Sequence, residues 1–388
     1  MSDVEYVIGS ENISNIPMQT YSDDICRFVE ALSEKLTKFG DVRRYPDVAA
    51  LAFWCRKGNI GRLKADFGST EFRLGRGLCF HVAPSNIPVN FAFSWLFALL
   101  AGNASVVRLP GKEYPQIEII CNILRGALRD FPEIEERTAF VRYPAQNEIT
   151  AKFCEIADAR MIWGGDGTVT EIRGLRTKPR CVDLTFADRY SLCVINGKAI
   201  LDTDENGLSR LAEHFFNDTW LMDQNACSSP QLILWINDSE EARGRFWDAA
   251  LVCASERYEL QTAVAVEKYA RMCEDALELE TLVGVRRDGN LLYRAELKAL
   301  RGPIENLRGR GGYFYEYRLK NLDELAAVVT DKYQTLTQFG MNEDELRGFV
   351  LQNRLRGIDR VVPVGRAMDI DVVWDGFDIV RMLSRVIA

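Results

Sequence analysis

Short apolar runs alternate with amphipathic segments between residues 75 and 190, and this alternation constrains the fold more than any other feature of the sequence. The runs with strand character are GLCFHVA (77–83), ASVVRL (104–109), RTAFVRY (137–143), ARMIW (159–163) and RCVDLTF (180–186). The spacing predicts helices over 88–102, 113–130 and about 146–157, and another from about 167. Such alternation predicts a parallel sheet covered by helices on both faces. Sheets of this kind bind ligands at the carboxyl ends of their strands.

A second unit is expected to start near residue 190. SLCVIN and QLILWI (231–236) have strand character, and helices are predicted over about 205–222, over 239–257 and over 322–333. Residues 258–312 show no clear boundaries, and the chain has no internal repeat or heptad array. Ahead of both units, residues 22–40 combine a Ser N-cap with helical spacing and a Gly stop. The sequence therefore predicts an α/β protein with two domains.

Charge and cysteine usage exclude several classes of protein. The formal net charge of −8 argues against a general affinity for nucleic acid or anionic membranes. The ten cysteines form no C-x-x-C pair and several lie in apolar runs, so free thiols in a reducing cytosol are expected. With His81 and His214 as the only histidines, we expect no metal centre. The polar opening predicts no signal peptide, and the apolar run 90–102 is too short to span a bilayer, which indicates a cytoplasmic protein.

Two turns that follow predicted strands carry polar side chains. In HVAPSNIPVNF (81–91), Asn86 could present an amide donor above the sheet, or it could simply cap the turn. In SVVRLPGKE (105–113), a strand ends in Arg108 and Lys112 follows it. Two cations at such a strand end could bind a phosphate or a ribose edge, or they could be ordinary surface charges.

Two further turns are candidates for chemistry. MIWGGDGTVTEIRG (161–174) places glycines between a strand and a helix, but Thr170 stands where the G-x-G-x-x-G motif requires its last glycine. In DQNACSSPQ (223–231), Cys227 lies in a polar turn before a strand, where backbone N–H groups could face an oxyanion. From these residues alone, Cys227 could be a nucleophile or a structural residue, and neither histidine can be placed beside it.

Together, these four turns resemble those of the aldehyde dehydrogenase superfamily, and within it the LuxC-type acyl-CoA reductases, the bacterial long-chain fatty acid reductases. The resemblance runs from about residue 75 to the C-terminus. Four stretches show the resemblance: APSNIPVNFAFSWLFALLAGNASVVRLPGK (83–112), IWGGDGTV (162–169), DQNACSSPQLILW (223–235) and GIDRVVPVGRAMDIDVVWDGFDIVRMLSR (357–385). The cysteine stretch and the Trp-Asp-Gly ending are specific to the reductases, whereas the Pro-x-Asn-x-Pro turn is shared with aldehyde dehydrogenases at large.

The resemblance implies an aldehyde-dehydrogenase-like fold. A Rossmann-type NAD(P)-binding domain, with an N-terminal helical segment, is expected over 1–189 and an α/β catalytic thiol domain over 190–364. The C-terminal segment 365–388 is expected either to oligomerise or to return to the cofactor domain.

The resemblance also assigns catalytic roles. Cys227 matches the acyl-accepting cysteine, and Asn86 matches the amide that stabilises the oxyanion together with the Cys227 backbone N–H. The Glu-Leu-Gly-Gly segment of the superfamily, whose glutamate activates water, has no good copy here. Asp183 in VDLTFAD (182–188) is the nearest substitute and a candidate for an acid or base. Loss of an efficient water-activating base suits a reductase that must protect a thioester from hydrolysis.

The cofactor residues follow from the same resemblance. Arg108 lies where related enzymes place a lysine against the adenosine ribose, so Arg108 and Lys112 are expected to bind the 2′-phosphate of NADPH, with NADH left open. Gly165 and Asp166 fall at the Gly-Ser turn near the cofactor. The implied reaction is NAD(P)H-dependent reduction of a fatty acyl-CoA, or of an acyl-protein thioester, to the aldehyde through a thioester on Cys227.

Three other functions stay open at this point. The chain could be a CoA-acylating aldehyde dehydrogenase that works in the oxidative direction, or an acyl transferase or thioesterase that uses Cys227 without redox chemistry. It could also be a non-catalytic relative that binds a nucleotide or a partner. The resemblance further implies a homo-oligomer, for which DVVWDGFDIVRML (371–383) could supply an interface, and a separate acyl-activating synthetase as a partner.

Overall fold

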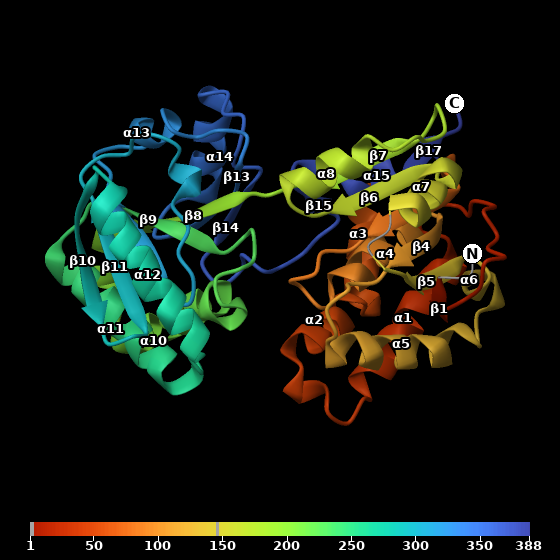
Figure 1. The fold of residues 1–388 in the computed structure, drawn as a ribbon, viewed down its shortest axis with the longest axis horizontal. Helices are drawn as coiled ribbons and strands as arrows, with labels where there is room; N and C mark the ends of the chain where they lie inside the picture. Colours follow the sequence, from red (N-terminus) through yellow and green to blue (C-terminus); the bar gives the residue numbers. More distant parts are fainter. Residues whose placement is uncertain (1–3, 145–146) are drawn as a thin grey trace. The chain divides into compact units, whose positions relative to one another are not determined.

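The computed structural model describes residues 4–144 and 147–388, and the chain forms two compact units (Figure 1). Unit 1 comprises residues 1–187 and 372–388, and unit 2 comprises residues 188–371. The chain thus leaves unit 1 after Ala187 and returns to it at Val372. Within the described ranges, no helix has the length and apolar character needed to cross a membrane.

Unit 1 is built on a sheet with the strand order β1-β5-β4-β3-β6-β7. Its strands are β1 (Glu5–Ile8), β3 (Leu78–Val82), β4 (Ala104–Arg108), β5 (Thr138–Arg142), β6 (Ala159–Trp163) and β7 (Val182–Phe186). β1 pairs antiparallel with β5, and the other neighbours pair parallel. The chain runs outward from β3 to β5 and then crosses back to β6 on the other side of β3. β3 and β6 therefore flank a topological switch point, beyond whose carboxyl ends such sheets bind ligands.

Helices cover both faces of this sheet because successive side chains of a strand point to opposite faces. The helices are α1 (Asp23–Thr37), α2 (Pro46–Trp54), α3 (Lys57–Phe67), α4 (Asn90–Leu100), α5 (Pro115–Leu128), α6 (Pro132–Glu135), α7 (Asn147–Ile156) and α8 (Asp166–Arg173), with a 3₁₀ turn at Val42–Arg44. Phe80 packs in one apolar cluster with Phe153 of α7 and Val169 of α8. Its neighbour His81 points to the other face and hydrogen-bonds Ser94 of α4.

The elements predicted between residues 22 and 186 are confirmed, with small differences at their ends. α1 begins after Ser22, whose side chain accepts the backbone N–H of Ile25 as an N-cap. α4, α5 and α8 correspond to predicted helices, and the strands are up to two residues shorter than the apolar runs. Position 146, where the next predicted helix begins, lies outside the described residues, and α7 is described from Asn147.

The last residues of the chain complete unit 1. They form β15 (Val373–Trp374), β16 (Phe377–Asp378), α15 (Ile379–Met382) and β17 (Ser384–Val386). β17 pairs antiparallel with β2 (Arg73–Gly75), which directly precedes the central strand β3. The start of the sheet and the end of the chain are therefore hydrogen-bonded to each other.

One buried amide strengthens this connection. Asn103 is 1% exposed, and its Oδ1 accepts the backbone N–H groups of Arg76 and Gly77. Its Nδ2 donates to the backbone carbonyls of Ala98 and Leu383. A single side chain thus satisfies backbone groups from α4, from the segment before β3 and from the C-terminal return.

Unit 2 has a sheet with the strand order β10-β11-β12-β9-β8-β13-β14. Its strands are β8 (Tyr190–Asn196), β9 (Pro230–Ile236), β10 (Leu282–Asp288), β11 (Leu292–Leu297), β12 (Tyr313–Arg318), β13 (Tyr333–Phe339) and β14 (Arg360–Pro363). β10 pairs antiparallel with β11, and the other neighbours pair parallel. The edge strand β10 and its neighbour β11 lie in the region 258–312, for which no bounds were predicted.

Helices again cover both faces of the sheet. They are α9 (Gly197–Asp202), α10 (Glu205–Asp218), α11 (Glu240–Arg257), α12 (Thr262–Glu278), α13 (Asp323–Ala326) and α14 (Glu343–Gln352), with 3₁₀ turns at Trp220–Met222 and Ile304–Asn306. Leu192 of β8 packs in one cluster with Leu346 of α14. Cys193, on the opposite face, packs with Phe215 of α10 and Phe246 of α11. The α/β class predicted from the alternation is confirmed in both units.

The predicted helix over 322–333 is wrong beyond its first turn. α13 ends at Ala326, and Tyr333 already begins β13, which lies between β8 and β14. Parallel pairing on both sides satisfies the backbone groups of β13. This long-range pairing overrides the helical spacing of the local sequence, because local propensity contributes only tenths of a kcal/mol per residue (roughly 0–0.7).

Replacing Asn103 by alanine should lower the free energy of unfolding of unit 1 by about 2–4 kcal/mol, because buried backbone N–H and carbonyl groups lose their partners. Hydrogen-exchange mass spectrometry in increasing urea measures this, since it reports the peptides of unit 1 separately from those of unit 2. The matched control is Asn122→Ala on the exposed side of α5, which should change the free energy by less than about 0.5 kcal/mol. Equal effects of the two substitutions would contradict the assigned role of Asn103.

Candidate active site

The loop that carries Cys227 begins with two residues in an unusual backbone conformation. α10 ends at Asp218, and the 3₁₀ turn 220–222 leads to Asp223 and Gln224, which have φ of 51° and 61°. Non-glycine residues adopt this left-handed region at a cost of about 1–3 kcal/mol each, so they persist only where other contacts hold them. The sequence predicted a helix up to residue 222, and this turn replaces its end.

The side chain of Gln224 holds this conformation. Its Oε1 accepts the backbone N–H of Gly312 at 3.1 Å, and its Nε2 donates to the carbonyls of Pro230 and Tyr313, also at 3.1 Å. Gln224 is 2% exposed, so these bonds form away from water. One amide therefore joins the cysteine loop, the start of β9 and the start of β12.

A second glutamine repeats the arrangement. Gln231 Nε2 donates to the backbone carbonyl of Gln224 at 2.9 Å, and Gln231 Oε1 accepts the N–H of Gly309 at 3.0 Å. Gly309 requires the absence of a side chain, because a Cβ there would lie 1.9 Å from the carbonyl oxygen of Tyr313. The glycine-containing segment 309–312 and the cysteine loop are thus hydrogen-bonded at several points.

Residues outside these two segments fix them further. The Asp223 carboxylate accepts the Tyr258 hydroxyl at 2.6 Å, and the Asp223 carbonyl accepts the N–H of Gly311 at 3.2 Å. Lys268 of α12, 2% exposed, donates to the carbonyl of Gly311 at 2.6 Å and to that of Leu291 at 3.3 Å. Burial lowers the pKa of Lys268 to about 8. Its ammonium group thereby holds the segment 309–312 next to the strained turn at Asp223 and Gln224.

The segment 365–368 contacts the loop from another part of the sequence. The Ser228 hydroxyl lies 3.5 Å from the Met368 sulfur. Asp218, at the end of α10, accepts the N–H groups of Gly365 at 2.6 Å and Ala367 at 2.9 Å. Burial raises the pKa of Asp218 to about 7, although both N–H groups act to lower it. The residue that follows Cys227 is therefore held by contacts from the C-terminal part of unit 2.

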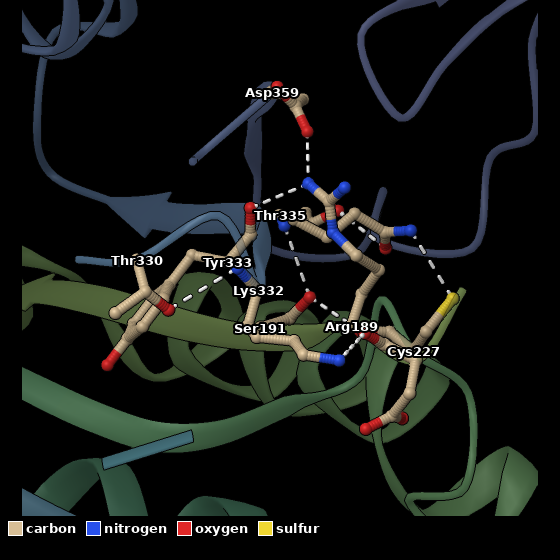
Figure 2. A network of polar contacts seen from close by, with 10 residues as sticks. Arg189, Ser191, Cys227, Thr330, Lys332, Tyr333, Thr335 and Asp359 are labelled. Carbon is tan, nitrogen blue, oxygen red and sulfur yellow. Dashed lines mark hydrogen bonds and ion pairs between the residues drawn. The ribbon is translucent and has the colours of Figure 1, made fainter. Parts of the chain in front are cut away.

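The thiol of Cys227 lies beside the amino ends of neighbouring strands, and Figure 2 shows its sulfur at one end of a polar network. Gln334 Nε2 donates to Cys227 Sγ at 3.3 Å. The Thr335 hydroxyl donates to Gln334 Oε1 at 3.3 Å, which fixes the orientation of the amide with its NH₂ group toward the sulfur. Ser191 donates to the Cys227 carbonyl at 2.7 Å and accepts the Thr335 N–H at 3.2 Å.

The other thiols and the histidines differ from Cys227. None of the ten cysteines forms a disulfide; Cys227 is partly exposed, whereas Cys121 and Cys193 are buried and burial raises the pKa of each to about 12. His81 is fully buried between the hydroxyls of Ser94 and Ser105, and burial lowers its pKa to about 3. His81 is therefore a neutral core residue of unit 1. His214 is exposed on α10. In the described part of the chain, no group of histidine, cysteine and acidic side chains could hold a metal ion.

In unit 1, the turn with Asn86 follows the central strand β3, and the turn is exposed at Asn86. The Tyr114 hydroxyl donates to the Ser85 carbonyl at 3.0 Å and so ties this turn to the loop after β4. Arg108 is the last residue of β4, and Lys112 lies in the loop that follows. The Arg108 guanidinium lies 4.6 Å from the centre of the Tyr143 ring, and the Lys112 ammonium lies 4.9 Å from that of Tyr114.

The glycine turn follows β6, the neighbour of β3 across the switch point. Gly165 is the N-cap of α8, with φ −68° and ψ 165°, a conformation that any residue adopts. A Cβ on Gly165 or Gly167 would meet no atom within 4 Å. Neither backbone strain nor packing requires these glycines, so their bare backbone leaves room for a ligand. Asp166 follows in the first turn of α8 and is exposed.

Asp183 has a partner that occupies its carboxylate. Arg160, 2% exposed, donates to both of its oxygens at 2.7 and 2.6 Å and also to the Ile172 carbonyl at 2.7 Å. The pair joins β6 to β7, and a bidentate geometry of this kind is strong. The structure therefore places Asp183 in an ion pair within unit 1.

A sequence profile of the family described as acyl-CoA reductase (LuxC) matches residues 62–259, slightly more than half of the chain. The chain belongs to this acyl-CoA reductase family. The matched range includes the turns with Asn86, Arg108, Gly165 and Cys227, so the family resemblance seen in the sequence is confirmed. As a member of this family, the protein is an oxidoreductase. No curated protein sequence matches the chain.

Solved structures of similar fold are aldehyde dehydrogenases. A 1-pyrroline-5-carboxylate dehydrogenase from Thermus thermophilus has a TM-score of 0.63 at 14% identity, covering 94% of this chain and 81% of that one. A 1-pyrroline-5-carboxylate dehydrogenase from Thermus with bound NAD has a TM-score of 0.64 at 14% identity, with 93% and 80% covered. An aldehyde dehydrogenase from Physcomitrella patens, in complex with succinate, has a TM-score of 0.61 at 13% identity, covering 95% of this chain and 86% of that one. The expected aldehyde-dehydrogenase-like fold is confirmed.

The sequence did not identify the residues that position the Cys227 thiol. Gln334 lies 107 positions from Cys227 in a strand, where nothing marks it as a contact of a cysteine. Gln224 and Gln231 lie inside the quoted cysteine stretch, but their partners in the segment 309–313 lie 78 to 89 positions away. For Gln231, a polar residue in the otherwise apolar strand PQLILWI was the available signal, since a buried amide needs partners.

Gln334→Leu should slow the alkylation of Cys227 by iodoacetamide at neutral pH about tenfold. The Gln334 amide donates to the sulfur and so favours the reactive thiolate, and leucine cannot replace this hydrogen bond. Mass spectrometry of the peptide that contains Cys227 measures the rate without interference from the other cysteines. The control is Gln338→Leu, a buried glutamine at the other end of β13, which should leave the rate unchanged. An unaltered rate in Gln334→Leu would show that this amide does not act on the sulfur.

Proposed function

We propose that this protein reduces an acyl thioester of fatty type to the aldehyde through a thioester on Cys227. The observation that carries the proposal is the placement of this thiol. It is partly exposed, it accepts an amide N–H, and its loop is held in a strained conformation by buried side chains. Membership in the acyl-CoA reductase family supports the same chemistry.

In the first half-reaction, the Cys227 thiolate attacks the carbonyl carbon and forms a new C–S bond, while the carbonyl electrons move to oxygen. The oxyanion then collapses and breaks the bond to the CoA sulfur, and CoA leaves as a thiolate that takes a proton from water. The proposed oxyanion donors are the Cys227 backbone N–H and the Asn86 amide, and one such donor typically lowers a barrier by about 3–4 kcal/mol. The role of Asn86 rests on the resemblance of its turn.

In the second half-reaction, a nicotinamide cofactor supplies the hydride that reduces the thioester carbon. The resulting thiohemiacetal on Cys227 collapses, so that the C–S bond breaks, the aldehyde leaves and the thiolate is restored. The Gln334 amide stabilises this thiolate as the leaving group, as it does before the attack. These steps are proposed without Asp183, because Arg160 donates to both of its carboxylate oxygens.

We propose unit 1 as the cofactor domain and unit 2 as the thiol domain. Unit 1 has a switch point between β3 and β6, with the bare backbone of Gly165 and Gly167 beyond β6. Asp166 in the first turn of α8 and the cations of the loop after β4 are the proposed polar contacts. Arg108 and Lys112 favour NADPH over NADH, because a guanidinium and an ammonium group suit a 2′-phosphate.

The acyl donor is proposed to be acyl-CoA or an acyl group on a separate acyl-activating synthetase. A cytoplasmic location is proposed because the ten cysteines, six of them buried, are thiols outside any disulfide, as expected in a reducing compartment.

Cys227→Ala should abolish aldehyde formation from acyl-CoA and NADPH, and intact-protein mass spectrometry should no longer detect an acyl adduct after exposure to acyl-CoA without cofactor. The experiment uses acyl-CoAs from short to long chain with NADPH and with NADH, and CoA release identifies the reductive direction. The control is Cys26→Ala, which removes a partly exposed thiol of unit 1 and should keep both activities. Full reductase activity in Cys227→Ala would contradict the mechanism. An acyl adduct on the wild-type protein without NAD(P)H-dependent aldehyde release would indicate acyl transfer instead.

Arg108→Leu should raise KM for NADPH at least about tenfold and leave KM for NADH nearly unchanged, because a charge-assisted hydrogen bond to phosphate contributes about 1.5–3 kcal/mol. Steady-state kinetics with both cofactors measures the difference. Arg142→Leu is the matched control, since Arg142 ends the neighbouring strand β5 and pairs with Glu118. Equal changes for the two cofactors would contradict a contact between Arg108 and the 2′-phosphate.

A further inference from the structure

α10 ends in a buried carboxylate just before the cysteine loop. Asp218 is the last residue of α10 and is 1% exposed. Its position disfavours a negative charge twice, because the carbonyl end of a helix is itself negative and because burial removes water from the charge. Asp218 therefore does not stabilise the helix that carries it. The contacts that it makes outside α10 have to offset this cost.

These contacts lie in the turn formed by residues 365–369. Asp218 Oδ2 accepts the N–H of Gly365 at 2.6 Å, and its Oδ1 accepts the N–H of Ala367 at 2.9 Å. Arg360, at the start of β14, donates to three carbonyl groups of the same turn at 2.7, 2.8 and 2.6 Å. A carboxylate thus holds the 365–369 turn by its N–H groups, and a guanidinium group holds it by its carbonyl groups.

The 365–369 turn packs between α10 and the cysteine loop. A Cβ on Gly365, whose φ is 97°, would lie only 2.6 Å from the Cβ of His214 on α10. Three residues further along, the Met368 sulfur accepts the Ser228 hydroxyl at 3.5 Å, and Ser228 is 2% exposed. Because both sides of the turn are in contact with other segments, a shift of the turn has to be taken up by Ser228.

Ser228 shares a tight turn with the thiol. The backbone N–H of Ser229 donates to the carbonyl of Ala226 at 2.9 Å, so Cys227 and Ser228 are the two central residues of this turn. The peptide unit that joins them is planar and moves as one piece. A displaced Ser228 therefore redirects the Cys227 side chain and moves its sulfur relative to the Gln334 amide, which lies at 3.3 Å.

We propose that Asp218 is a positioning residue for the Cys227 thiol, because its carboxylate holds the 365–369 turn against Ser228. Asp218 does not act on the sulfur directly but through the backbone of the turn and through Met368. This role rests on the proposed function, since it adds a residue to the same thiol chemistry. It also explains why a carboxylate stands at a buried helix end that disfavours it.

The role depends on the charge of Asp218. Burial, and to a smaller degree Asp369, raises the pKa of Asp218 to about 7, although the two N–H groups and Arg360 act to lower it. The carboxylate form is therefore present above about pH 7 and is lost as the pH falls through this value. A neutral carboxyl group accepts hydrogen bonds more weakly, and one of its oxygens carries a proton toward an N–H donor. The 365–369 turn is then held less firmly.

Other charged or titratable groups face Asp218 from each element around it. They are His214 on α10, Cys193 on β8, Arg360 on β14, and Arg366 and Asp369 in the 365–369 turn. Burial raises the pKa of Cys193 to about 12, so this thiol stays neutral, and the arginines stay charged. Histidine is the other residue type in this set that changes charge near neutral pH. His214 therefore needs a control of its own.

Asp218→Asn should slow the alkylation of Cys227 by iodoacetamide about tenfold at about pH 8, because an amide offers one neutral acceptor where the carboxylate offers two charged ones. Mass spectrometry of the peptide that contains Cys227, from about pH 6 to about pH 9, measures the rate. Below about pH 7, the wild-type rate should fall about a hundredfold per pH unit, since the thiolate and the Asp218 carboxylate are both lost. The rate of the variant should fall about tenfold per pH unit, since only the thiolate is lost.

The matched control is Asp202→Asn, because Asp202 is the last residue of α9 and is exposed. It should leave the rate and its pH dependence unchanged. His214→Gln should keep the steep fall of the wild type below about pH 7. The buried thiol of Cys253, read in the same spectra, should react slowly in every variant, which shows that unit 2 is folded.

Gly365→Ala tests the same contact from the other side. The added methyl group meets His214 and displaces the 365–369 turn while the Asp218 carboxylate is intact, so alkylation of Cys227 should slow at least about threefold at about pH 8. If Cys253 reacts rapidly in one variant, the other variant and the wild-type pH profile decide.

Three outcomes would overturn the proposal. They are a wild-type rate that falls only about tenfold per pH unit, a steep fall that His214→Gln removes, and wild-type rates in folded Asp218→Asn or Gly365→Ala. Alkylation requires neither an acyl thioester nor a cofactor. A wrong reaction would therefore appear as full reductase activity in Cys227→Ala, and it would leave this comparison intact.

Discussion

The geometry around Cys227 depends on the buried side-chain amide of Gln224. Three hydrogen bonds from this one group join the cysteine loop, the carbonyl at the start of β9 and the segment before β12. They offset the unfavourable backbone conformation of Asp223 and Gln224 itself, which is what turns the chain from α10 toward the strand. The orientation of the thiol therefore follows from a polar network and not from apolar packing. Such a network is effective because each of its members is satisfied and shielded from water.

Buried charge extends this network to the surface of unit 2. Lys268 supports Gly311, whose N–H in turn contacts the carbonyl of Asp223 in the cysteine loop. Asp275, one heptad further along α12, anchors the hydroxyls of two tyrosines on β12. The same two residues determine which face of α12 is exposed. The support of the thiol loop thus depends on the polar side of one helix.

The two units place their candidate site turns at opposite ends of their strands. In unit 1, the turns with Asn86, Arg108 and Gly165 follow strands, at the carboxyl ends where a parallel sheet opens at its switch point. In unit 2, Cys227 precedes β9, and its contacts Ser191 and Gln334 lie in the first residues of β8 and β13. The general expectation of carboxyl-end sites thus describes the first unit and not the second. The position of the Cys227 thiol depends on residues at the amino ends of the strands.

The sequence by itself determined the local elements and the polar character of single turns. Alternating apolar runs, the Ser22 cap and the polar turn of Cys227 all depend on neighbours within a few positions, so they could be read correctly without a structure. Only the tertiary structure decided that 327–333 leads into β13 rather than extending a helix, and that Gln334 meets Cys227. It likewise decided that Asp183 is paired with Arg160 and that α12 faces outward with its apolar side. These outcomes depend on strand pairing and buried hydrogen bonds between residues far apart in the chain, and the free energy of such contacts exceeds the local preferences that sequence reports.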